Sequence, residues 1–224
     1  MSYKVKLIDS VQLTHDVKRF IIEKPSSFTY TPGQAIDMSI NTPDLKDETR
    51  PFTFTSLESA EDLEFTIKRY DDHQGITKRI HALDNGSELL ITKPFGAIHY
   101  DGEGVFIAGG AGVTPFIAIL RMLRSRGLLG NNKLIFSNKT SSDVILEDEW
   151  KDVFKKSPQN LILTLTREKR ENYENGRIDS NFLSKHINDY SKHFYVCGPK
   201  PFVKEIRGHL ESLGASPEFL IFEK

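Results

Sequence analysis

The sequence predicts a two-domain protein: an antiparallel β-barrel or sandwich over residues 1–100, followed by an α/β domain over residues 101–224. Three observations support this prediction. The first hundred residues hold many short strand-like segments separated by turn residues, which is typical of antiparallel β structure. From about Val105 onward, apolar strand-like runs alternate with helix-like runs, which indicates a parallel sheet wound on both faces. Between the halves lies Tyr100-Asp-Gly-Glu-Gly104, whose glycines suit a connection.

In the first half, strands are expected where apolar and polar residues alternate, or where an apolar run stops at a turn residue. The expected strands are residues 3–8, 17–23, 34–40, 52–55, 63–70 and 88–92. Pro32-Gly33 and Asn85-Gly86 mark turns. A short helix is expected over residues 76–83.

In the second half, the same reasoning predicts alternating strands and helices. The expected strands are residues 105–108, 133–137, 161–166, 193–196 and 219–222. The expected helices are residues 114–126, 144–156 and 201–213, with a further short helix capped by Asp179 or Ser180. Gly127 and Gly214 follow two of these helices, where glycine commonly ends a helix.

Composition excludes several classes of function. The chain has 224 residues, 38% hydrophobic and 27% charged, with a net charge of −1, so it is not built as a whole for nucleic acid. Cys197 is the only cysteine, which excludes an intrachain disulfide and a four-cysteine metal or iron–sulfur site. The histidines show no metal-binding spacing. No apolar run approaches the ~18 residues of a membrane helix, so we expect a cytoplasmic protein without a membrane partner.

The first strand of the α/β half runs into the glycine-rich stretch Gly110-Ala-Gly-Val-Thr-Pro115. Glycine lets the backbone turn sharply and approach a ligand closely. The helix that follows directs its N–H groups and positive dipole end at the turn, which favours an anion, and Pro115 suits the first helical turn. A plain strand-to-helix connection is the alternative. The position after the first strand of the α/β half favours dinucleotide binding.

A second informative stretch is Arg50-Pro-Phe-Thr-Phe-Thr-Ser56. Strand alternation predicts Phe52 and Phe54 on one face and Thr53 and Thr55 on the other. An arginine can pair with a phosphate in fork geometry, and an aromatic ring can lie against a flat ligand ring. An ordinary barrel strand with a surface arginine is the alternative.

Arg50-Pro-Phe-Thr53 resembles the Arg-x-Tyr-Ser/Thr flavin motif of the ferredoxin–NADP reductase superfamily. Five further stretches resemble other motifs of this family and follow in the same order. They are His73-Gln-Gly-Ile-Thr77, Thr92-Lys-Pro-Phe-Gly96, Gly109-Gly-Ala-Gly-Val-Thr-Pro115, Leu165-Thr-Arg-Glu168 and Val196-Cys-Gly-Pro199. Together the six stretches cover nearly the whole chain.

The resemblance implies an FAD-binding antiparallel Greek-key β-barrel followed by an NAD(P)-binding α/β domain. It implies an NAD(P)H-dependent oxidoreductase that passes a hydride to FAD and then single electrons to an acceptor. No iron–sulfur domain is attached, so the acceptor is expected to be external: a flavodoxin, a ferredoxin or an oxygenase component. The sequence does not predict the oligomeric state.

The resemblance also implies roles for residues of the first half. Arg50 would neutralise the flavin pyrophosphate, and Thr53 would hydrogen-bond near flavin N5 and is the expected catalytic group. Gly75, Ile76 and Thr77 would offer N–H groups and a hydroxyl to the same pyrophosphate. The other expected flavin contacts are Pro51, Phe52, Ile67 and Arg69.

In the second half, the resemblance implies that Gly110, Gly112 and Val113 let the NAD(P)H phosphates approach. Thr114 and Cys197 would border the nicotinamide, with Cys197 acting through proximity and not as a nucleophile or metal ligand. The remaining expected nucleotide contacts are Pro115, Thr166, Arg167, Gly198 and Pro199.

Thr166-Arg-Glu-Lys-Arg170 is the expected neighbour of the adenosine ribose. Its three basic residues favour the 2′-phosphate of NADPH over NADH, and a solvated loop is the alternative. Basic residues on two other expected helices, namely Lys78, Arg79, Arg121, Arg124 and Arg126, are candidates for meeting an acidic carrier protein.

Two further functions stay open, and a departure from the family pattern supports the first of them. Phe52 stands where most members have tyrosine, so the ring can stack but a hydroxyl is missing. Some members with Arg-Pro-Phe use FMN or FAD as a loosely held substrate, so an NAD(P)H-dependent free flavin reductase is one alternative. An electron-transfer subunit of a larger complex is the other.

Overall fold

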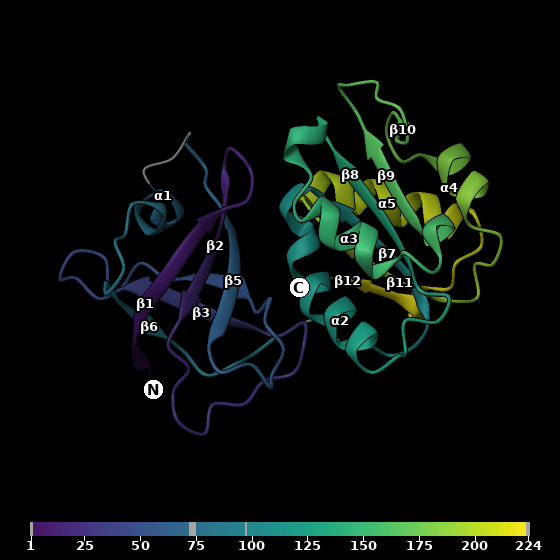
Figure 1. Ribbon diagram of the computed structural model, residues 1–224. Coiled ribbons are helices and arrows are strands. Elements are labelled where there is room, and N and C mark those ends of the chain that lie inside the picture. Colours follow the sequence, from purple (N-terminus) through teal and green to yellow (C-terminus); the bar gives the residue numbers. More distant parts are fainter. Residues whose placement is uncertain (1, 72–74, 97, 223–224) are drawn as a thin grey trace. The chain divides into compact units, whose positions relative to one another are not determined.

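The computed structural model describes residues 2–71, 75–96 and 98–222. Its chain divides into two compact units (Figure 1). The first comprises Met1–His99 with Thr114–Ile119, and the second Tyr100–Val113 with Leu120–Lys224. None of the described helices is long and apolar enough to cross a membrane.

The first unit is built on one antiparallel sheet and a short helix. Its elements are β1 (Tyr3–Gln12), β2 (Val17–Ile22), β3 (Ala35–Ile40), β4 (Arg50–Thr53), β5 (Leu63–Lys68), α1 (Ile76–His81) and β6 (Glu88–Ile91). The strand order is β4-β3-β6-β1-β2-β5, and a bridge between Phe54 and Phe65 joins the two edges. A bulge between Leu7 and Asp9 bends β1, which pairs with β6 before it and with β2 beyond it. The expected barrel-like fold is confirmed.

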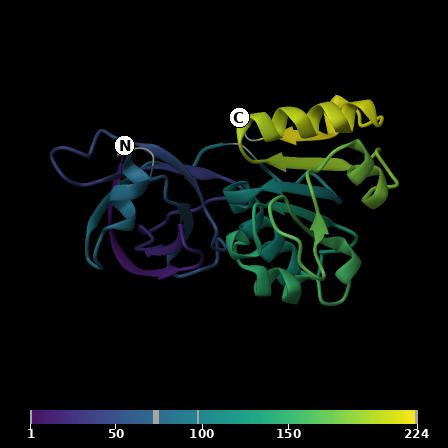
Figure 2. The ribbon, with the colours of Figure 1, turned by 90° about the horizontal axis from the view of Figure 1, so that it is seen from above.

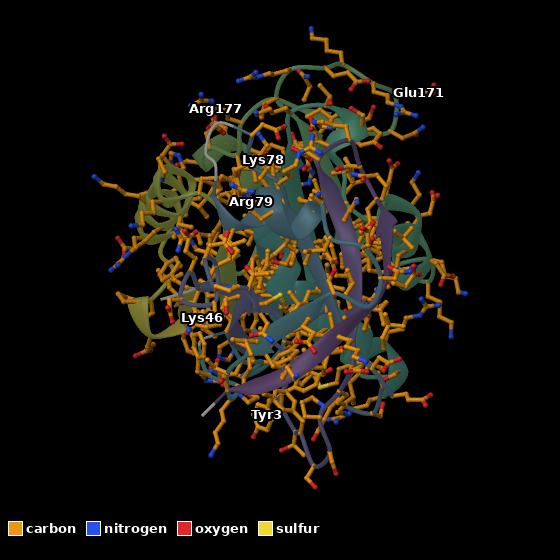
Figure 3. All side chains as sticks on the ribbon, turned by 90° about the vertical axis from the view of Figure 1, so that its left-hand side faces the viewer. Tyr3, Lys46, Lys78, Arg79, Glu171 and Arg177 are labelled. Atoms are coloured by element: carbon orange, nitrogen blue, oxygen red, sulfur yellow. The ribbon has the colours of Figure 1, made fainter. Side chains whose placement is uncertain are left out.

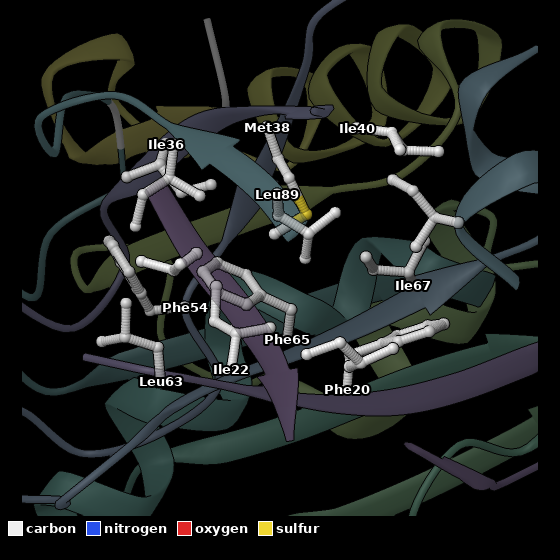
Figure 4. Packing of buried hydrophobic residues seen from close by; sticks show 14 of the residues in the cluster. Phe20, Ile22, Ile36, Met38, Ile40, Phe54, Leu63, Phe65, Ile67 and Leu89 are labelled. Carbon is white, nitrogen blue, oxygen red and sulfur yellow. The ribbon is translucent and has the colours of Figure 1, made fainter. Parts of the chain in front are cut away.

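The interior of the barrel is filled by alternate side chains of these strands (Figure 4). Phe20, Ile22, Phe54 and Phe65 are at most 2% exposed. Tyr30 stacks on Phe54 with ring centroids 3.9 Å apart. The Tyr30 hydroxyl reaches polar atoms of residues 56 and 57, so a buried aromatic keeps its hydrogen bonds.

The second unit contains a parallel six-stranded sheet with helices on both faces. Its strands are β7 (Gly104–Gly109), β8 (Lys133–Asn138), β9 (Leu161–Leu165), β10 (Glu174–Asn175), β11 (His193–Cys197) and β12 (Leu220–Phe222), in the order β10-β9-β8-β7-β11-β12. Its α-helices are α3 (Glu147–Val153), α4 (Ser180–His186) and α5 (Lys200–Ser212), together with the second half of α2 (Thr114–Ser125), whose residues Thr114–Ile119 belong to the first unit. Figure 2 shows α5 on one face of this sheet and α3 on the other. Every residue of central β7 is buried, as expected for a strand covered on both faces.

Two elements of the second unit differ from the sequence-based expectation. The helix expected over residues 144–156 is confined to Glu147–Val153, because Leu146 adopts a left-handed backbone with φ 58° just before it. Strand β10 was not expected, since its two residues are defined by pairing with Thr164 and Leu165 of β9. Short 3₁₀ turns also occur at Gly110–Val113, Ser141–Asp143, Pro158–Asn160 and Pro217–Phe219.

His81, the last residue of α1, is a buried histidine in the first unit. Its Nε2 lies 2.8 Å from the carbonyl oxygen of Ile67, and its ring packs edge-on against Phe20. Among the described residues, Nδ1 has no hydrogen-bond partner. Burial lowers the pKa of His81, and the positive charges of Lys18 and Arg69 lower it further, while the Ile67 carbonyl opposes the shift.

We expect His81 to make the first unit less stable in acid. Its folded-state pKa lies below the unfolded value of about 6.5. The unfolded chain therefore takes up the proton first, and the free energy of unfolding falls as the pH drops below about 6.5. Urea unfolding at pH 7.5 and 5.5 should show a smaller loss in His81→Gln than in the unmodified chain. An equal loss in both proteins would contradict this assignment. The smaller loss expected to remain in His81→Gln is assigned to His186, because burial also lowers the pKa of that histidine.

Candidate functional site

Arg50, the first residue of β4, carries an exposed guanidinium group at the edge of the barrel sheet. It lies opposite Met38 of β3, and its Nη1 donates to the carbonyl oxygen of Thr49 at 2.7 Å. Within the described ranges, no carboxylate forms an ion pair with it. An exposed, unpaired guanidinium fits an anionic ligand such as a pyrophosphate.

The residues after Arg50 alternate between the two faces of the strand, as expected. Phe54 is fully buried in the barrel core, and Phe52 packs against the same core while staying partly exposed. Thr53 and Thr55 point the other way, and the Thr55 hydroxyl donates to Glu64 Oε1 at 2.7 Å. The partly exposed Phe52 ring is the part of this strand that fits a flat ring system.

Helix α1 begins at Gly75, Ile76 and Thr77, the part of the second expected flavin motif that the structure describes; His73 of that motif lies outside the described residues. Gly75 is the N-cap with φ −74° and ψ 170°. Among the described residues, no side chain caps the helix start, and the first turn holds no acidic residue. Because the first N–H groups of a helix have no partner within it, this end is suited to accept an anion.

Two expected flavin contacts have their side chains engaged elsewhere. Ile67 is 1% exposed, and its side chain belongs to the barrel core. The guanidinium of Arg69 is paired with Asp71 at 2.8 and 3.1 Å. The sequence predicted both residues on one strand, whereas β5 ends at Lys68. Only the structure shows that the Ile67 side chain faces inward and that Arg69 forms an ion pair with Asp71. Any role for Ile67 is therefore limited to its backbone.

In the second unit, β7 leads through the turn Gly110–Val113 into α2, and the two inner glycines differ in role. Gly110 has φ 53°, and a Cβ built on it would meet no atom of the described residues within 4 Å. A Cβ on Gly112 would lie 2.4 Å from the carbonyl oxygen of Cys197. Gly110 therefore supplies the turn with open space beside it, while Gly112 supplies a close contact between two loops.

The start of α2 completes this loop. Val113 is the N-cap and is fully buried, and Pro115 lies in the first turn. The helix start has neither a side-chain cap nor an acidic residue in its first turn. Open space at Gly110 together with an uncapped helix of 12 residues fits the phosphates of a dinucleotide. Val113 can take part only through its backbone.

The turn Cys197-Gly-Pro199 lies at the carboxyl end of β11, next to the glycine loop. Cys197 pairs with Ala108 of β7 and is 2% exposed. A Cβ on Gly198 would lie 2.7 Å from the Phe202 ring, so glycine is needed there as well. Two motifs far apart in the sequence thus form one wall at the carboxyl edge of the sheet. Among the described residues, no group of three His, Cys, Asp or Glu side chains could hold a metal ion.

The segment after β9 is held in place by backbone and side-chain hydrogen bonds. The N–H groups of Thr166 and Arg167 donate to the carbonyls of Asn138 and Lys139. The Glu168 carboxylate accepts from the N–H and hydroxyl of Ser141 at 2.7 and 3.1 Å. The side chain of Arg167 is exposed, and no ion pair to it is formed within the described part of the chain.

Arg177 is a residue that the sequence reasoning missed. It follows β10 by two positions, and Asn175 of β10 pairs with Leu165 of β9, two positions before Arg167. Arg177 is exposed and is labelled in Figure 3. Only the unexpected pairing of β10 with β9 reveals that two arginines follow neighbouring strands at the same edge.

Two of the basic residues expected to meet an acidic carrier form ion pairs within the chain. Arg121 binds Glu149 through two hydrogen bonds of 2.6 and 2.8 Å, and Arg124 pairs with Asp152. These ion pairs join α2 to α3, so both arginines hold these two helices together. Lys78 and Arg79, visible with Lys46 in Figure 3, form no ion pair among the described residues.

Comparison with known families agrees with this geometry. Residues 4–100 match the family model described as an oxidoreductase FAD-binding domain, and residues 106–208 match that of an oxidoreductase NAD-binding domain.

Curated relatives were also found. The chain is 26% identical over 226 residues to the glycine betaine monooxygenase reductase subunit of Chromohalobacter salexigens, covering 95% of this chain and 61% of that protein. It is 28% identical over 218 residues to NADH-cytochrome b5 reductase 2-A of Vanderwaltozyma polyspora, covering 90% and 72%. It is 26% identical over 201 residues to the reductase component of propane 2-monooxygenase of Mycolicibacterium goodii, covering 84% and 57%. The chain thus spans only part of these relatives.

Solved structures show the same fold. The FAD/NAD-binding domain of nitric oxide dioxygenase from Vibrio cholerae superposes with a TM-score of 0.88 at 18% identity, covering 100% of this chain and 98% of that one. A flavohemoglobin from Malassezia yamatoensis with bound FAD and heme gives 0.86 at 26% identity, covering 99% and 59%. A ferredoxin NADP+ reductase from Neisseria gonorrhoeae gives 0.84 at 18% identity, covering 99% and 98%.

Proposed function

Because the chain belongs to the ferredoxin–NADP reductase superfamily, we propose that it passes a hydride from a nicotinamide nucleotide to FAD and then single electrons to an external acceptor. The chain carries an FAD-binding domain followed by an NAD-binding domain. The observation that carries the proposal is the packing of Gly112 against the Cys197 carbonyl. This contact brings the glycine loop and the Cys-Gly-Pro turn together beside the open Gly110.

The residues of the first unit would hold the flavin nucleotide. Arg50 would pair with its pyrophosphate, the start of α1 would add N–H donors, and the exposed edge of Phe52 would lie against the ring. Thr53 is 8% exposed, so its hydroxyl would act in a site largely shielded from water. When bound, the flavin supplies the ability to accept a hydride and release electrons one at a time.

The residues of the second unit would hold and orient the nicotinamide nucleotide. The uncapped start of α2 and the open side of Gly110 would receive the phosphates. Cys197 and Thr114 would border the nicotinamide ring. Their contribution is orientation, because hydride transfer requires the two rings to meet in a narrow range of geometries.

Replacing Arg50 tests the flavin site. We expect Arg50→Gln to raise the Kd for FAD roughly 10-fold or more, since a hydrogen bond to a charged group contributes about 1.5–3 kcal/mol. Arg50→Lys keeps the positive charge but loses the two-pronged guanidinium geometry. Its Kd for FAD should therefore lie between those of the unmodified chain and Arg50→Gln. The measurement is equilibrium FAD binding by flavin fluorescence. Equal Kd values for all three proteins would remove Arg50 from the site.

A free flavin reductase is the second candidate, and Phe52 is the residue that favours it, because it offers no hydroxyl to the flavin nucleotide. In that case flavin would leave the protein on desalting, and nicotinamide oxidation would require added FMN or FAD. An electron-transfer subunit of a larger complex would instead reduce ferricyanide poorly without its partner.

The acceptor is proposed to be a redox protein. The relatives include reductase components of oxygenases and an NADH-cytochrome b5 reductase, so an oxygenase component or a small haem protein is favoured over a flavodoxin. Reduction of cytochrome b5 and of a [2Fe–2S] ferredoxin, measured side by side, would distinguish these acceptor classes.

The choice of nucleotide rests on the edge formed by β9 and β10. We propose that Arg167 and Arg177 together receive the 2′-phosphate of NADPH. The relatives do not support this preference, since several are named for NADH. The double variant Arg167→Gln/Arg177→Gln should raise the KM for NADPH about 10-fold and leave that for NADH unchanged. The control is Lys204→Gln, which changes an exposed side chain of α5. A lower KM for NADH than for NADPH in the unmodified chain would overturn the proposal.

A further inference from the structure

Asn138, the last residue of β8, has a buried carboxamide without a hydrogen-bond partner. The residue is 5% exposed, and neither its Oδ1 nor its Nδ2 is paired among the described residues. In the part of the chain that the structure describes, no other side chain has two such atoms. Buried polar side-chain atoms nearly always have a partner in the protein or in an ordered water. A partner from outside the chain is therefore expected for this carboxamide.

Asn132, which directly precedes β8 at the opposite edge of the sheet, is a buried asparagine with a purely structural role. It is 1% exposed, and its Oδ1 accepts from the N–H of Gly104 at 2.9 Å. Its Nδ2 donates to the hydroxyl of Tyr100 at 3.1 Å and to the carbonyl oxygen of Leu129 at 2.8 Å. The two ends of β8 thus carry the same side chain at similar burial, and Asn138 is the one whose amide the fold does not use.

Asn138 lies at the carboxyl edge of the parallel sheet, between two expected nucleotide contacts of the same unit. The β7–β8 ladder ends one position before Asn138, so Asn138 stands beside Gly110. On its other side it pairs with Leu165 of β9, two positions before Arg167. Neighbouring strands are about 4.8 Å apart. The glycine loop, Asn138 and the end of β9 therefore follow one another along this edge, each about one strand spacing from the next.

The backbone around Asn138 is fixed by the segment after β9. The Asn138 carbonyl oxygen accepts from the N–H of Thr166 at 2.9 Å and from the Thr166 hydroxyl at 3.3 Å. The N–H of Arg167 donates to the carbonyl oxygen of Lys139 at 2.8 Å. The carboxamide, by contrast, can change its rotamer without breaking a hydrogen bond. It can thus turn toward a ligand beside Gly110 while its strand stays in place.

We propose that Asn138 is a nucleotide-binding residue, whose carboxamide bonds the adenosine ribose of the nicotinamide nucleotide and the phosphate attached to that ribose. This inference rests on the proposed function. There the phosphates lie at Gly110 and the 2′ position of the ribose lies at Arg167, so the ribose and its 5′-phosphate fall between them. The Oδ1 of Asn138 accepts from a ribose hydroxyl and its Nδ2 donates to a phosphate oxygen, which uses both atoms.

The test is Asn138→Leu, which replaces the carboxamide by an apolar side chain. Isothermal titration calorimetry should give a Kd for ADP-ribose raised about 10-fold, because two hydrogen bonds to the ligand are lost. The Kd for nicotinamide mononucleotide, which represents the other half of the dinucleotide, should stay within about twofold. The ligand-free variant should unfold at the same urea concentration as the unmodified chain or at a higher one, because no hydrogen bond within the protein is lost.

The matched control is Asn132→Leu, the same substitution at the other end of β8. It removes the hydrogen bonds to residues 100, 104 and 129, so it should unfold at a lower urea concentration. Its Kd for ADP-ribose, measured where the variant is folded, should stay within about twofold. Asn138→Ala serves if leucine does not fit at position 138, and it should raise the Kd for ADP-ribose by a similar factor.

Three results would overturn the inference. A Kd for ADP-ribose within twofold of the unmodified value in both Asn138 variants would remove Asn138 from the site. A loss of stability in ligand-free Asn138→Leu as large as that in Asn132→Leu would show that the carboxamide serves the fold. A Kd raised for nicotinamide mononucleotide instead of ADP-ribose would contradict the placement at the adenosine ribose.

Failure of the proposed function gives a different result. If the unmodified chain binds neither ADP-ribose nor NAD+ nor NADP+, the nucleotide site itself fails, and the role of Asn138 fails with it. If the unmodified chain binds these ligands and the Asn138 variants bind them equally well, only the role of Asn138 fails.

Discussion

Replacing Gly112 by alanine is expected to raise the KM for the nicotinamide nucleotide roughly 100-fold while leaving flavin binding intact. The added Cβ would lie 2.4 Å from the carbonyl oxygen of Cys197 and 2.5 Å from the nitrogen of Gly198. Both are backbone atoms and cannot rotate aside like a side chain. The glycine loop and the Cys-Gly-Pro turn must therefore separate by about 1 Å to restore ordinary contact, which displaces the groups that would hold the nucleotide.

Gly208→Ala is the matched control for this substitution. Gly208 lies within α5, and a Cβ there would meet nothing within 4 Å. Alanine in a helix interior is preferred over glycine by about 1 kcal/mol, so the control should be as stable as the unmodified chain or more stable. Steady-state kinetics, flavin content and thermal unfolding of both variants separate the site effect from a general loss of stability. A normal KM in Gly112→Ala would contradict the role assigned to this contact.

Gly33→Ala is expected to destabilise the first unit by at least about 3 kcal/mol, through a backbone clash added to conformational strain. Gly33 has φ 95°, and a Cβ there would lie 1.8 Å from the carbonyl oxygen of Ile98. Both residues belong to the first unit, so the overlap cannot be relieved by moving one unit as a whole.

Gly86→Ala isolates the conformational part of this loss. Gly86 has a similar φ of 89°, but a Cβ there would meet nothing within 4 Å. It should cost only about 1–2 kcal/mol, the penalty for a left-handed alanine. The free energy of unfolding from urea titrations gives both numbers. Equal losses in the two variants would show that the contact with Ile98 relaxes without cost.

The fold could be predicted to the extent that local patterns determine it. Alternation marked the barrel strands, and Gly127 and Gly214 take the positive φ expected after α2 and α5. What failed left no local pattern to read. The helix expected over residues 144–156 is shorter because Leu146 adopts a left-handed backbone just before Glu147, and β10 exists only through its pairing with β9.

The candidate site shows the same division. Arg50 and the glycine loop could be predicted as site residues because residue type and spacing alone indicate their chemistry. In the structure, Arg50 is exposed and Gly110 has open space beside it. Arg69 forms an ion pair with Asp71, and Arg121 forms one with Glu149. These pairs depend on the directions of the side chains, which the periodicity of the sequence does not predict. The sequence did not predict Arg177 as a site residue, because its position near the end of β9 follows only from the pairing of β10 with β9.

In the proposed function, one chain binds a flavin and reduces it with a nicotinamide nucleotide. The most direct measurement is the visible spectrum of the purified, desalted protein, followed by anaerobic addition of NADH or NADPH in separate samples. We expect a retained flavin band near ~450 nm that bleaches with one equivalent of nucleotide. A colourless protein that oxidises the nucleotide only after free flavin is added would contradict it and make the flavin a substrate.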